Sequence, residues 1–299
     1  MPKELTHWLL ADRIHRQLPA DSRLAGIISQ HHSLYLIGAV LPDTLLHLYR
    51  GPASATALDL ADRFHDTVGN SFEPLIRAES AYPGGLSPAM LACLLGVITH
   101  MQADIVFHPL VNALTGQEGI GRHYRVETDI DCCFVSAGTL PAITRLTDLF
   151  APGNRETAIE ACSRLFDPEG VLPRIAIEDA LELHCRIQAM YDSTFWKLAA
   201  LLLATVVRGP YRARQHLFYP LSSRHTGPFT PDGQLTWRHP HSGEQRHCSL
   251  NDLVNETVAR GVTLFSEIEI AGSLTPALNA RPGENLSTGL FGVRQDSFT

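Results

Sequence analysis

Along most of the chain, apolar residues recur every three to four positions, which is the spacing that buries one face of a helix. Residues 5–18 show this stripe, and Pro19 ends it. Ser87 and Pro88 are residue types that favour a helix start, and the segment that they open reaches about Leu114. The same spacing predicts helices over residues 22–30, 33–43, 53–81, 121–137, 155–166, 175–190, 194–207 and 250–268. The sequence therefore predicts an all-α, multi-helix protein.

The composition of the chain changes at about His216. Proline and glycine become frequent beyond this point, and the short run 234–237 is typical of a strand in a small hairpin. A tail rich in glycine, proline and asparagine follows the last predicted helix. We therefore expect a helical domain over residues 1–215 and a small irregular or β-hairpin C-terminal extension over residues 216–299, packed on it.

Hydrophobicity and cysteine content bear on the location of the protein. No stretch reaches about 18 uninterrupted apolar residues, the length of a membrane span, and the N-terminus lacks the basic region and apolar core of a secretory signal. The 6 cysteines form no C-x-x-C pair, which is typical of reduced thiols. We therefore expect a cytoplasmic protein without a transmembrane segment.

The charge balance of the chain is acidic, with 24 basic and 31 acidic side chains and a formal net charge of −7. This balance argues against an extended nucleic-acid surface and against a polybasic membrane patch. The 15 histidines outnumber the 12 phenylalanines. Because histidine is the commonest metal ligand and titrates near neutral pH, its positions are the first indication of chemistry.

The helix predicted from Ser87 onward carries three ionisable residues within an apolar run. His100, Asp104 and His108 are spaced at i, i+4 and i+8, so their side chains point into one sector of the helix. That sector should be buried, and a buried carboxylate is costly unless it is paired or bound to a metal. Two flanking imidazoles favour a cation as the partner. A hydrogen-bonded His–Asp–His stack in the core is the alternative.

The next predicted helix repeats this spacing, because His123 and Glu127 are also four residues apart. One such pair is weak support for a metal site, since polar neighbours at i, i+4 occur on many solvated helix faces. Two adjacent helices with the same pattern support a metal site more strongly. Three isolated residues lie upstream: His7, Asp43 and His65. Together the eight side chains supply enough nitrogen and oxygen ligands for two or three four-coordinate zinc ions completed by water.

The order of these eight residues resembles that of the zinc-dependent phospholipase C family, which is similar in fold to the single-strand-specific fungal nucleases. The resemblance covers residues 5–135 in ordered motifs and the helical remainder more loosely. It implies an all-helical catalytic domain that holds three clustered zinc ions. It also implies these ligand sets: Asp43, His65, His100 and Asp104 for one ion; His108, His123 and Glu127 for a second; and His7 with the shared Asp104 for a third.

Two departures from the family pattern affect the details. Secreted members supply a processed N-terminal tryptophan to the third zinc ion, whereas this chain begins with Met1-Pro2. Removal of Met1 would leave an amine five residues ahead of His7, the offset seen in the nuclease branch. Choline-selective members carry aromatic residues where this chain has Thr44 and Asp62, so choline specificity does not transfer. We expect two or three zinc ions per chain, and the sequence does not identify the head group of the substrate.

The resemblance implies hydrolysis of a phosphoester by metal-activated water. Zinc ions about 3.5–4 Å apart hold the attacking and leaving oxygens of an in-line displacement, and zinc brings the pKa of bound water towards about 7. Asp43 is the candidate catalytic residue, because a terminal carboxylate ligand can also orient that water or take its proton. Asp66 and Asp131 are either acceptors for imidazole N–H groups or charges on helix surfaces. Phospholipid is the expected substrate through the resemblance alone.

Three alternatives stay open. A metal phosphohydrolase of the HD type would use His65-Asp66 as adjacent ligands, but it would leave His123 and Glu127 without a role. A nuclease-like phosphodiesterase would act on a different phosphoester. A non-catalytic protein would bind a lipid or a protein partner, although structural zinc sites are usually closed and rich in cysteine, which this set lacks. The C-terminal histidines match no chelating pattern and are typical of a solvated loop: His225, His239, His241 and His247.

Overall fold

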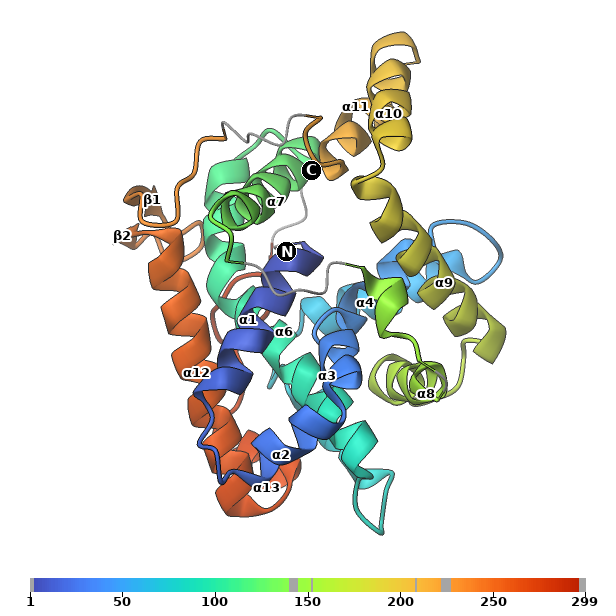
Figure 1. Cartoon of the computed structure of the whole chain (residues 1–299), viewed down its shortest axis with the longest axis vertical. Coiled ribbons are helices and arrows are strands. Elements are labelled where there is room, and N and C mark those ends of the chain that lie inside the picture. The colour runs from blue at the N-terminus through green and yellow to red at the C-terminus, as the bar shows by residue number, and fades with distance from the viewer. Residues whose placement is uncertain (1–2, 140–144, 152, 208, 222–226, 296–299) are drawn as a thin grey trace.

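The computed structural model describes residues 3–139, 145–151, 153–207, 209–221 and 227–295. Within these residues nearly all regular structure is helical, and a single two-stranded antiparallel sheet accompanies it (Figure 1). The predicted all-α fold with a small hairpin near the C-terminus is confirmed.

The helices before the first gap are α1 (Glu4–Gln17), α2 (Arg23–Gln30), α3 (His32–Gly38), the 3₁₀ helix η1 (Leu41–His47), α4 (Ser54–His65), α5 (Glu73–Ser80), α6 (Pro88–Thr115) and α7 (Ile120–Ser136). The later elements are the 3₁₀ helix η2 (Leu146–Leu149), α8 (Asn154–Phe166), α9 (Arg174–Tyr191), α10 (Thr194–Val206), α11 (Pro210–Arg214), the 3₁₀ helix η3 (Gln215–Leu217), β1 (Leu235–Arg238), β2 (Gln245–Cys248), α12 (Leu250–Ala271) and α13 (Leu274–Ala280).

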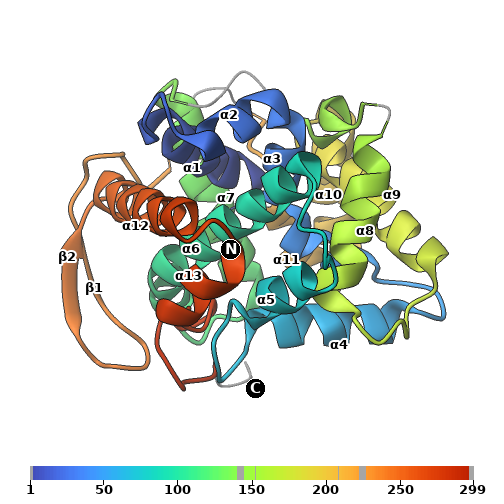
Figure 2. The same ribbon diagram turned by 90° about the horizontal axis from the view of Figure 1, so that it is seen from below.

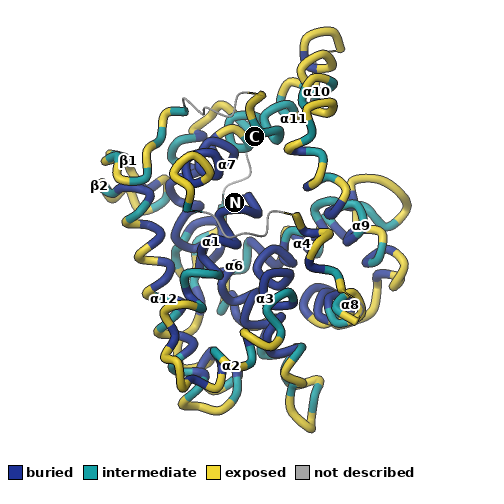
Figure 3. Tube along the Cα trace, viewed as in Figure 1, coloured by how far each residue is buried: buried dark blue, intermediate teal, exposed yellow. Residues whose placement is uncertain are grey.

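Helix α6 is the central element of the bundle. It packs against α1, α2, α3, α7, α8 and α12, and two perpendicular views show it running through the middle of the molecule (Figure 1, Figure 2). By length and composition alone α6 could cross a membrane, but its whole apolar window is buried by the surrounding elements. Figure 3 shows the buried residues gathered along α1, α3 and α6. The apolar side chains of α6 thus lie at the centre of the protein core. Burial in this core also holds the polar residues of α6 in fixed positions.

Two glycines allow α3 to approach α6 closely. A Cβ atom on Gly96 would lie 2.0 Å from the carbonyl oxygen of Tyr35, and one on Gly38 would lie equally close to a carbonyl oxygen of α6. Both neighbours are helix backbone, which cannot move aside as a flexible side chain can. The contact fixes the end of α3, where the carbonyl oxygen of Ala39 accepts a hydrogen bond from His100. Close packing of α3 on α6 therefore positions this histidine.

The substitution Gly96→Ala is expected to destabilise the protein by about 3 kcal/mol or more, because the added methyl group overlaps backbone atoms. Gly26→Ala in α2 is the matched control, since a Cβ atom there meets nothing within 4 Å. That control should be neutral or stabilising by up to about 1 kcal/mol, because glycine is unfavourable inside a helix. Equilibrium urea unfolding measures both, and equal stability of Gly96→Ala and the wild type would contradict the close contact.

The single long helix expected over residues 53–81 is wrong, because the structure has two helices there, α4 and α5, separated by a turn. Asn70 stabilises that turn: its side-chain oxygen accepts hydrogen bonds from the backbone N–H groups of Phe72 and Gly283, at 3.1 and 2.7 Å. Gly283 is 213 positions away in the sequence. The break therefore depends on a tertiary contact, which the local apolar spacing cannot show.

The C-terminal part contributes to the same core as the helices before it. Strands β1 and β2 pair antiparallel, with Leu235 opposite Cys248. Helix α12 packs against α1 and α6, and its side chains Leu264 and Phe265 are buried in the common hydrophobic core. The division of the chain at residue 215 stays a prediction.

Helix α13 lies where the sequence predicts only an irregular tail. The backbone N–H groups of Leu274 and Thr275 in its first turn donate to the carboxylate of Glu79, at 2.8 and 2.6 Å. A carboxylate at this end satisfies N–H groups that have no partner within the helix and interacts favourably with the helix dipole. Since Glu79 belongs to α5, this stabilisation leaves no local signature in the sequence.

Candidate metal centre

All eight predicted ligands lie in groups of three whose ligand atoms are within 4.8 Å of one another. The groups are His7, Asp43 and His100; His65, His100 and Asp104; and His108, His123 and Glu127. They come from α1, η1, α4, α6 and α7. The structure therefore brings together side chains that are spread along the sequence from position 7 to position 127, and we call them the zinc cluster.

Three imidazoles of the zinc cluster are oriented by backbone carbonyl groups. The pairs are His65 Nδ1 with Ala61 O at 2.8 Å, His100 Nδ1 with Ala39 O at 3.0 Å and His108 Nδ1 with Leu286 O at 2.6 Å. Because a carbonyl oxygen only accepts, each Nδ1 carries the proton and each Nε2 presents a lone pair. Histidines that bind metals are usually held in this way, with one ring nitrogen donating to the protein.

Asp104 lies at the centre of the zinc cluster, and its side chain is completely buried. Its Oδ1 atom is 3.6 Å from Nε2 of His7. Its Oδ2 atom is 3.1 Å from Nε2 of His100 and 4.0 Å from Nε2 of His65. The two carboxylate oxygens therefore face different histidines, which is the arrangement of a carboxylate shared between two cations.

Two of these three distances, those from Asp104 to His7 and to His65, are too long for hydrogen bonds. An N–H···O hydrogen bond is about 2.9 Å long, whereas two ligands at about 2.0 Å from a tetrahedral zinc ion lie about 3.3 Å apart. Both oxygens of Asp104 and both ring nitrogens of His7 are buried without a hydrogen-bond partner among the described residues. Such groups are costly, and a cation would satisfy them. The hydrogen-bonded core stack is therefore not formed, and the donor set fits zinc.

The first two groups contain two carboxylates, Asp43 and Asp104, and solvent reaches only that of Asp43. Its side chain is 13% exposed, whereas that of Asp104 is not exposed. Its Oδ1 atom lies 3.5 Å from Nε2 of His65 and 3.9 Å from Nε2 of His100, and it has no hydrogen-bond partner in the described part of the chain. Asp43 can therefore contact both an ion held by these histidines and a water molecule at its edge.

The third group is built from α6 and α7, which pack against each other. His123 and Glu127 face each other across one turn of α7, with Nε2 2.8 Å from Oε1, as their spacing of four predicts. The imidazole of His108 lies opposite, with its centre 6.3 Å from that of His123. Three protein ligands is the number found in catalytic zinc sites, where water takes the fourth position.

Burial favours the neutral form of two imidazoles of the zinc cluster, those of His7 and His108, whereas for His100 the carboxylates of Asp104 and Asp43 outweigh burial and raise the pKa. Burial lowers the pKa of His7 to about 4, with a further contribution from neighbouring His100, and it lowers the pKa of His108 to about 3. Both imidazoles are therefore neutral at pH 7. Burial alone would raise the pKa of Asp104, but His100 and His108 outweigh it and hold this pKa well below its usual value. Neutral imidazoles and ionised carboxylates are the forms that coordinate zinc.

A family model described as zinc dependent phospholipase C matches residues 6–166, more than half of the chain. The chain belongs to the zinc-dependent phospholipase C family. The matched range contains the whole zinc cluster. No curated protein and no solved structure matches the chain significantly. Family membership names zinc as the ion, while the assignment of individual residues to individual ions stays a prediction.

Asp66 follows the candidate ligand His65 in sequence, but its hydrogen bonds are to the C-terminal tail. Its Oδ1 atom accepts hydrogen bonds from Nδ2 of Asn285 at 2.8 Å and from the backbone N–H group of Gln295 at 3.1 Å. It belongs to none of the metal-binding groups among the described residues. The His65-Asp66 ligand pair that an HD-type enzyme needs is therefore not formed there, and Asp66 is not an imidazole acceptor.

Asp131 has neither of the two roles expected for it. It is completely buried, so it is not a surface charge. It accepts hydrogen bonds from the backbone and hydroxyl groups of Thr6 and, at 2.8 Å, from the hydroxyl group of Tyr219, rather than from an imidazole. Burial raises its pKa to about 6. Asp131 thus ties α1 to α7 and fixes the position of the residue after Thr6, which is the candidate ligand His7.

One part of the centre has no counterpart in the sequence-based prediction, namely the tail after α13. The carbonyl oxygen of Leu286 orients His108, and the carbonyl oxygen of Ser287 accepts a hydrogen bond from Asn112 of α6 at 2.8 Å. The Ser287 hydroxyl group also donates to the carbonyl oxygen of His65, at 3.4 Å. Backbone carbonyl groups carry no side-chain signature, so no motif could have identified this contact.

Two further expectations concern the N-terminal amine and the histidines of the C-terminal segment. Met1 and Pro2, and with them the N-terminal amine considered for a third zinc site, lie outside the described residues, as does His225. The expectation of a solvated loop is wrong for His239, which is buried and whose Nδ1 accepts hydrogen bonds from the backbone N–H groups of His241 and Ser242, both at 3.3 Å. This histidine holds a turn together.

Proposed function

We propose that this protein is a zinc-dependent hydrolase of a phosphodiester, similar in reaction to phospholipase C. The observation that carries the proposal is the position of Asp104, whose two oxygens face His7 on one side and His65 and His100 on the other. A shared carboxylate supports adjacent ions, and adjacent ions serve in-line displacement at phosphorus. A mixed donor set of histidine and carboxylate, without cysteine, is typical of catalytic zinc sites.

The residues of the zinc cluster have separable tasks in this reaction. The bound ions would supply Lewis acidity, which lowers the pKa of water and offsets the charge of the phosphate. Asp43 would orient the attacking water or take its proton, because its carboxylate lies at the solvent-exposed edge. The Nδ1 hydrogen bonds of His65 and His100 would hold their rings in place during the displacement.

Phospholipid is the substrate class that we favour. Family membership supports it, and so does the apolar surface of α10, which projects from the body of the molecule (Figure 1). Four side chains spaced along this helix are each more than half exposed: Phe195, Leu198, Leu202 and Val206. Exposed apolar patches mark contacts with proteins or membranes. A lipid aggregate would cover this surface, whereas a dispersed phosphoester would not.

Removal and re-addition of zinc tests the proposed hydrolysis. Chelation followed by desalting should reduce phosphodiester hydrolysis to background, and zinc should restore it in proportion to the number of ions bound per chain. The assay panel comprises a phosphomonoester, a soluble phosphodiester, phospholipid vesicles and single-stranded DNA. A zinc-loaded protein that is inactive on all four would overturn the proposal in favour of metal-dependent binding. Cleavage of single-stranded DNA alone would favour the nuclease-like alternative.

A further inference from the structure

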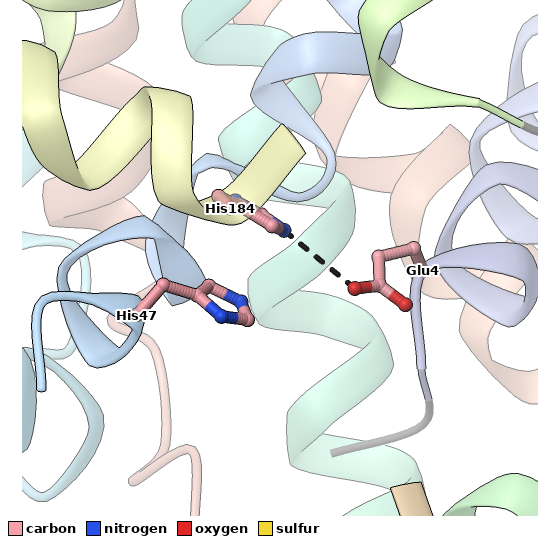
Figure 4. A group of neighbouring side chains, drawn as sticks. All are labelled: Glu4, His47 and His184. Carbon is pink, nitrogen blue, oxygen red and sulfur yellow. Dashed lines mark ion pairs between the residues drawn. The ribbon is translucent and has the colours of Figure 1, made fainter. Parts of the chain in front are cut away.

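A second group of potential metal ligands lies on α1, on η1 and on α9, and the first two of these elements also carry residues of the zinc cluster. Glu4, His47 and His184 come from the start of α1, the end of η1 and the middle of α9, and their ligand atoms lie within 4.8 Å of one another (Figure 4). Glu4 and His184 are buried, and His47 is half-buried. We call these three residues the Glu4 cluster. The sequence-based ligand set contains none of them.

Two buried atoms of the Glu4 cluster have no hydrogen-bond partner within the described residues, namely Oε2 of Glu4 and Nε2 of His184. Nε2 of His184 lies 3.6 Å from Oε1 of Glu4, which is longer than a hydrogen bond. The separation is close to the value of about 3.3 Å for two ligands on one tetrahedral zinc ion. Because a buried carboxylate without partners is costly, this geometry points to a cation as the common partner.

The contacts and burial of His47 and His184 suit coordination of a metal ion. Nδ1 of His184 lies 3.1 Å from the hydroxyl oxygen of Thr44, and its Nε2 faces Glu4. The rings of His47 and His184 are stacked, with centres 4.2 Å apart and an interplanar angle of 20°. Burial, together with neighbouring His184, lowers the pKa of His47 to about 3, so this ring is neutral at pH 7. Two imidazoles and one carboxylate form a donor set that suits zinc and related ions.

The cationic side chain next to Glu4 in sequence is engaged elsewhere. The ammonium group of Lys3 lies 3.6 Å from the centre of the Tyr191 ring and donates a hydrogen bond to the carbonyl oxygen of Leu217. Within the described residues, it forms no ion pair with Glu4 at hydrogen-bonding range. Burial opposes ionisation of Glu4, but His184 and Lys3 lower the pKa of its carboxyl group, so Lys3 attracts Glu4 without giving its Oε2 atom a hydrogen-bond partner.

We propose that Glu4, His47 and His184 bind one divalent transition-metal ion, with zinc as the expected occupant. The three side chains would be the protein ligands, and water would be the fourth, since His47 is only half-buried. Because each ligand comes from a different element, the ion fastens α9 to α1 and η1. This site would stabilise the fold next to the zinc cluster rather than take part in hydrolysis.

The proposed site shares no ligand with the zinc cluster. Helix α1 carries Glu4 for one and His7 for the other, and η1 carries His47 and Asp43 in the same way. Glu4 and His184 both lie outside the range 6–166 that the family model matches. The Glu4 cluster is therefore an addition to the region that defines the family.

Counting bound zinc tests the proposed site. The stripped protein is reloaded with zinc and desalted, and zinc per chain is measured by mass spectrometry of the elements. Glu4→Gln and His47→Gln should each bind one ion fewer than the wild type, and the double variant should also bind one ion fewer, because both residues hold the same ion. His15→Gln is the matched control, since His15 is a half-buried helical histidine that contacts Ala25 and Ser29. It should bind as many ions as the wild type.

Equal zinc content in the wild type and both single variants would overturn the inference, and so would a loss of two ions in the double variant. Circular dichroism of the stripped proteins confirms that the variants fold. If Glu4→Gln does not fold, a zinc anomalous map of wild-type crystals decides: a peak between the three side chains supports the site, and its absence at full loading overturns it. The zinc counts do not depend on hydrolysis. If the wild type is inactive but Glu4→Gln and His47→Gln each bind one ion fewer than it does, the proposed site stands and only the proposed function is overturned.

Discussion

Replacing Asp104 by alanine is expected to release zinc from the zinc cluster and to lower phosphodiester hydrolysis by at least about 100-fold. Substitutions that only remove the support of a metal ligand already cost about 10–100-fold in affinity or activity. Asp104→Ala removes a ligand whose two oxygens face His7 on one side and His65 and His100 on the other. Its effect should therefore spread over two ion positions. Zinc per chain and initial rates on a phosphodiester measure the two losses.

Asp66→Asn is the matched control for this experiment. Asp66 is an aspartate beside the zinc cluster, but its hydrogen bonds go to Asn285 and Gln295 in the C-terminal tail. Its variant should keep the zinc content of the wild type, whereas His123→Ala should lose an ion because His123 faces Glu127 and His108. Loss of zinc in Asp66→Asn together with full zinc content in His123→Ala would contradict the ligand set and restore the HD-type alternative.

The shared direction of the candidate ligands on α6 and α7 could be predicted because both helices carry them four residues apart. His100 and Asp104 lie one turn apart on α6, as do His123 and Glu127 on α7, so sequence spacing translates directly into a shared direction. The start of α6 could be predicted for a similar reason, since Ser87 caps this helix through its own side chain. In these segments local chemistry determines both the element and the direction of its side chains.

The other ligands have no such local pattern. His7, Asp43 and His65 each stand alone in their segments, so only the resemblance to a family could connect them. Their convergence depends on the packing of α1 and η1 on α6 and of α4 on η1. The Glu4 cluster is hidden for the same reason, because it joins three elements that are far apart in the sequence. Family membership could not identify it either, since two of its residues lie outside the matched range.

The errors in the predicted fold have the same physical origin. The apolar spacing over residues 53–81 suits one long helix, but the side chain of Asn70 binds the distant backbone of Gly283 and stabilises a turn instead. Helix α13 forms where composition suggests a loop, because Glu79 of α5 binds its first N–H groups. In both places a polar side chain and a distant backbone group decide the local structure. Hydrophobic periodicity contains no information on such pairs.

Asp43→Asn is expected to lower kcat for phosphodiester hydrolysis by about 100- to 10,000-fold, the usual contribution of a general acid or base. The amide has the same shape as the carboxylate, but it cannot take a proton from water. His65, His100 and Asp104 remain in place to hold an ion, so zinc content at saturating zinc should stay near that of the wild type. Asp62→Asn, which changes an exposed aspartate of α4, should leave both kcat and zinc content unchanged.

The zinc dependence of the Asp43→Asn rate separates the two roles of this residue. If Asp43 acts on the attacking water, the rate stays low even when excess zinc fills the cluster, because the defect is in proton transfer or orientation. If Asp43 only binds metal, excess zinc restores the wild-type kcat, and that recovery would contradict its catalytic role. The 13% exposure of Asp43, against the complete burial of Asp104, favours the first outcome, since only the exposed carboxylate can reach incoming water.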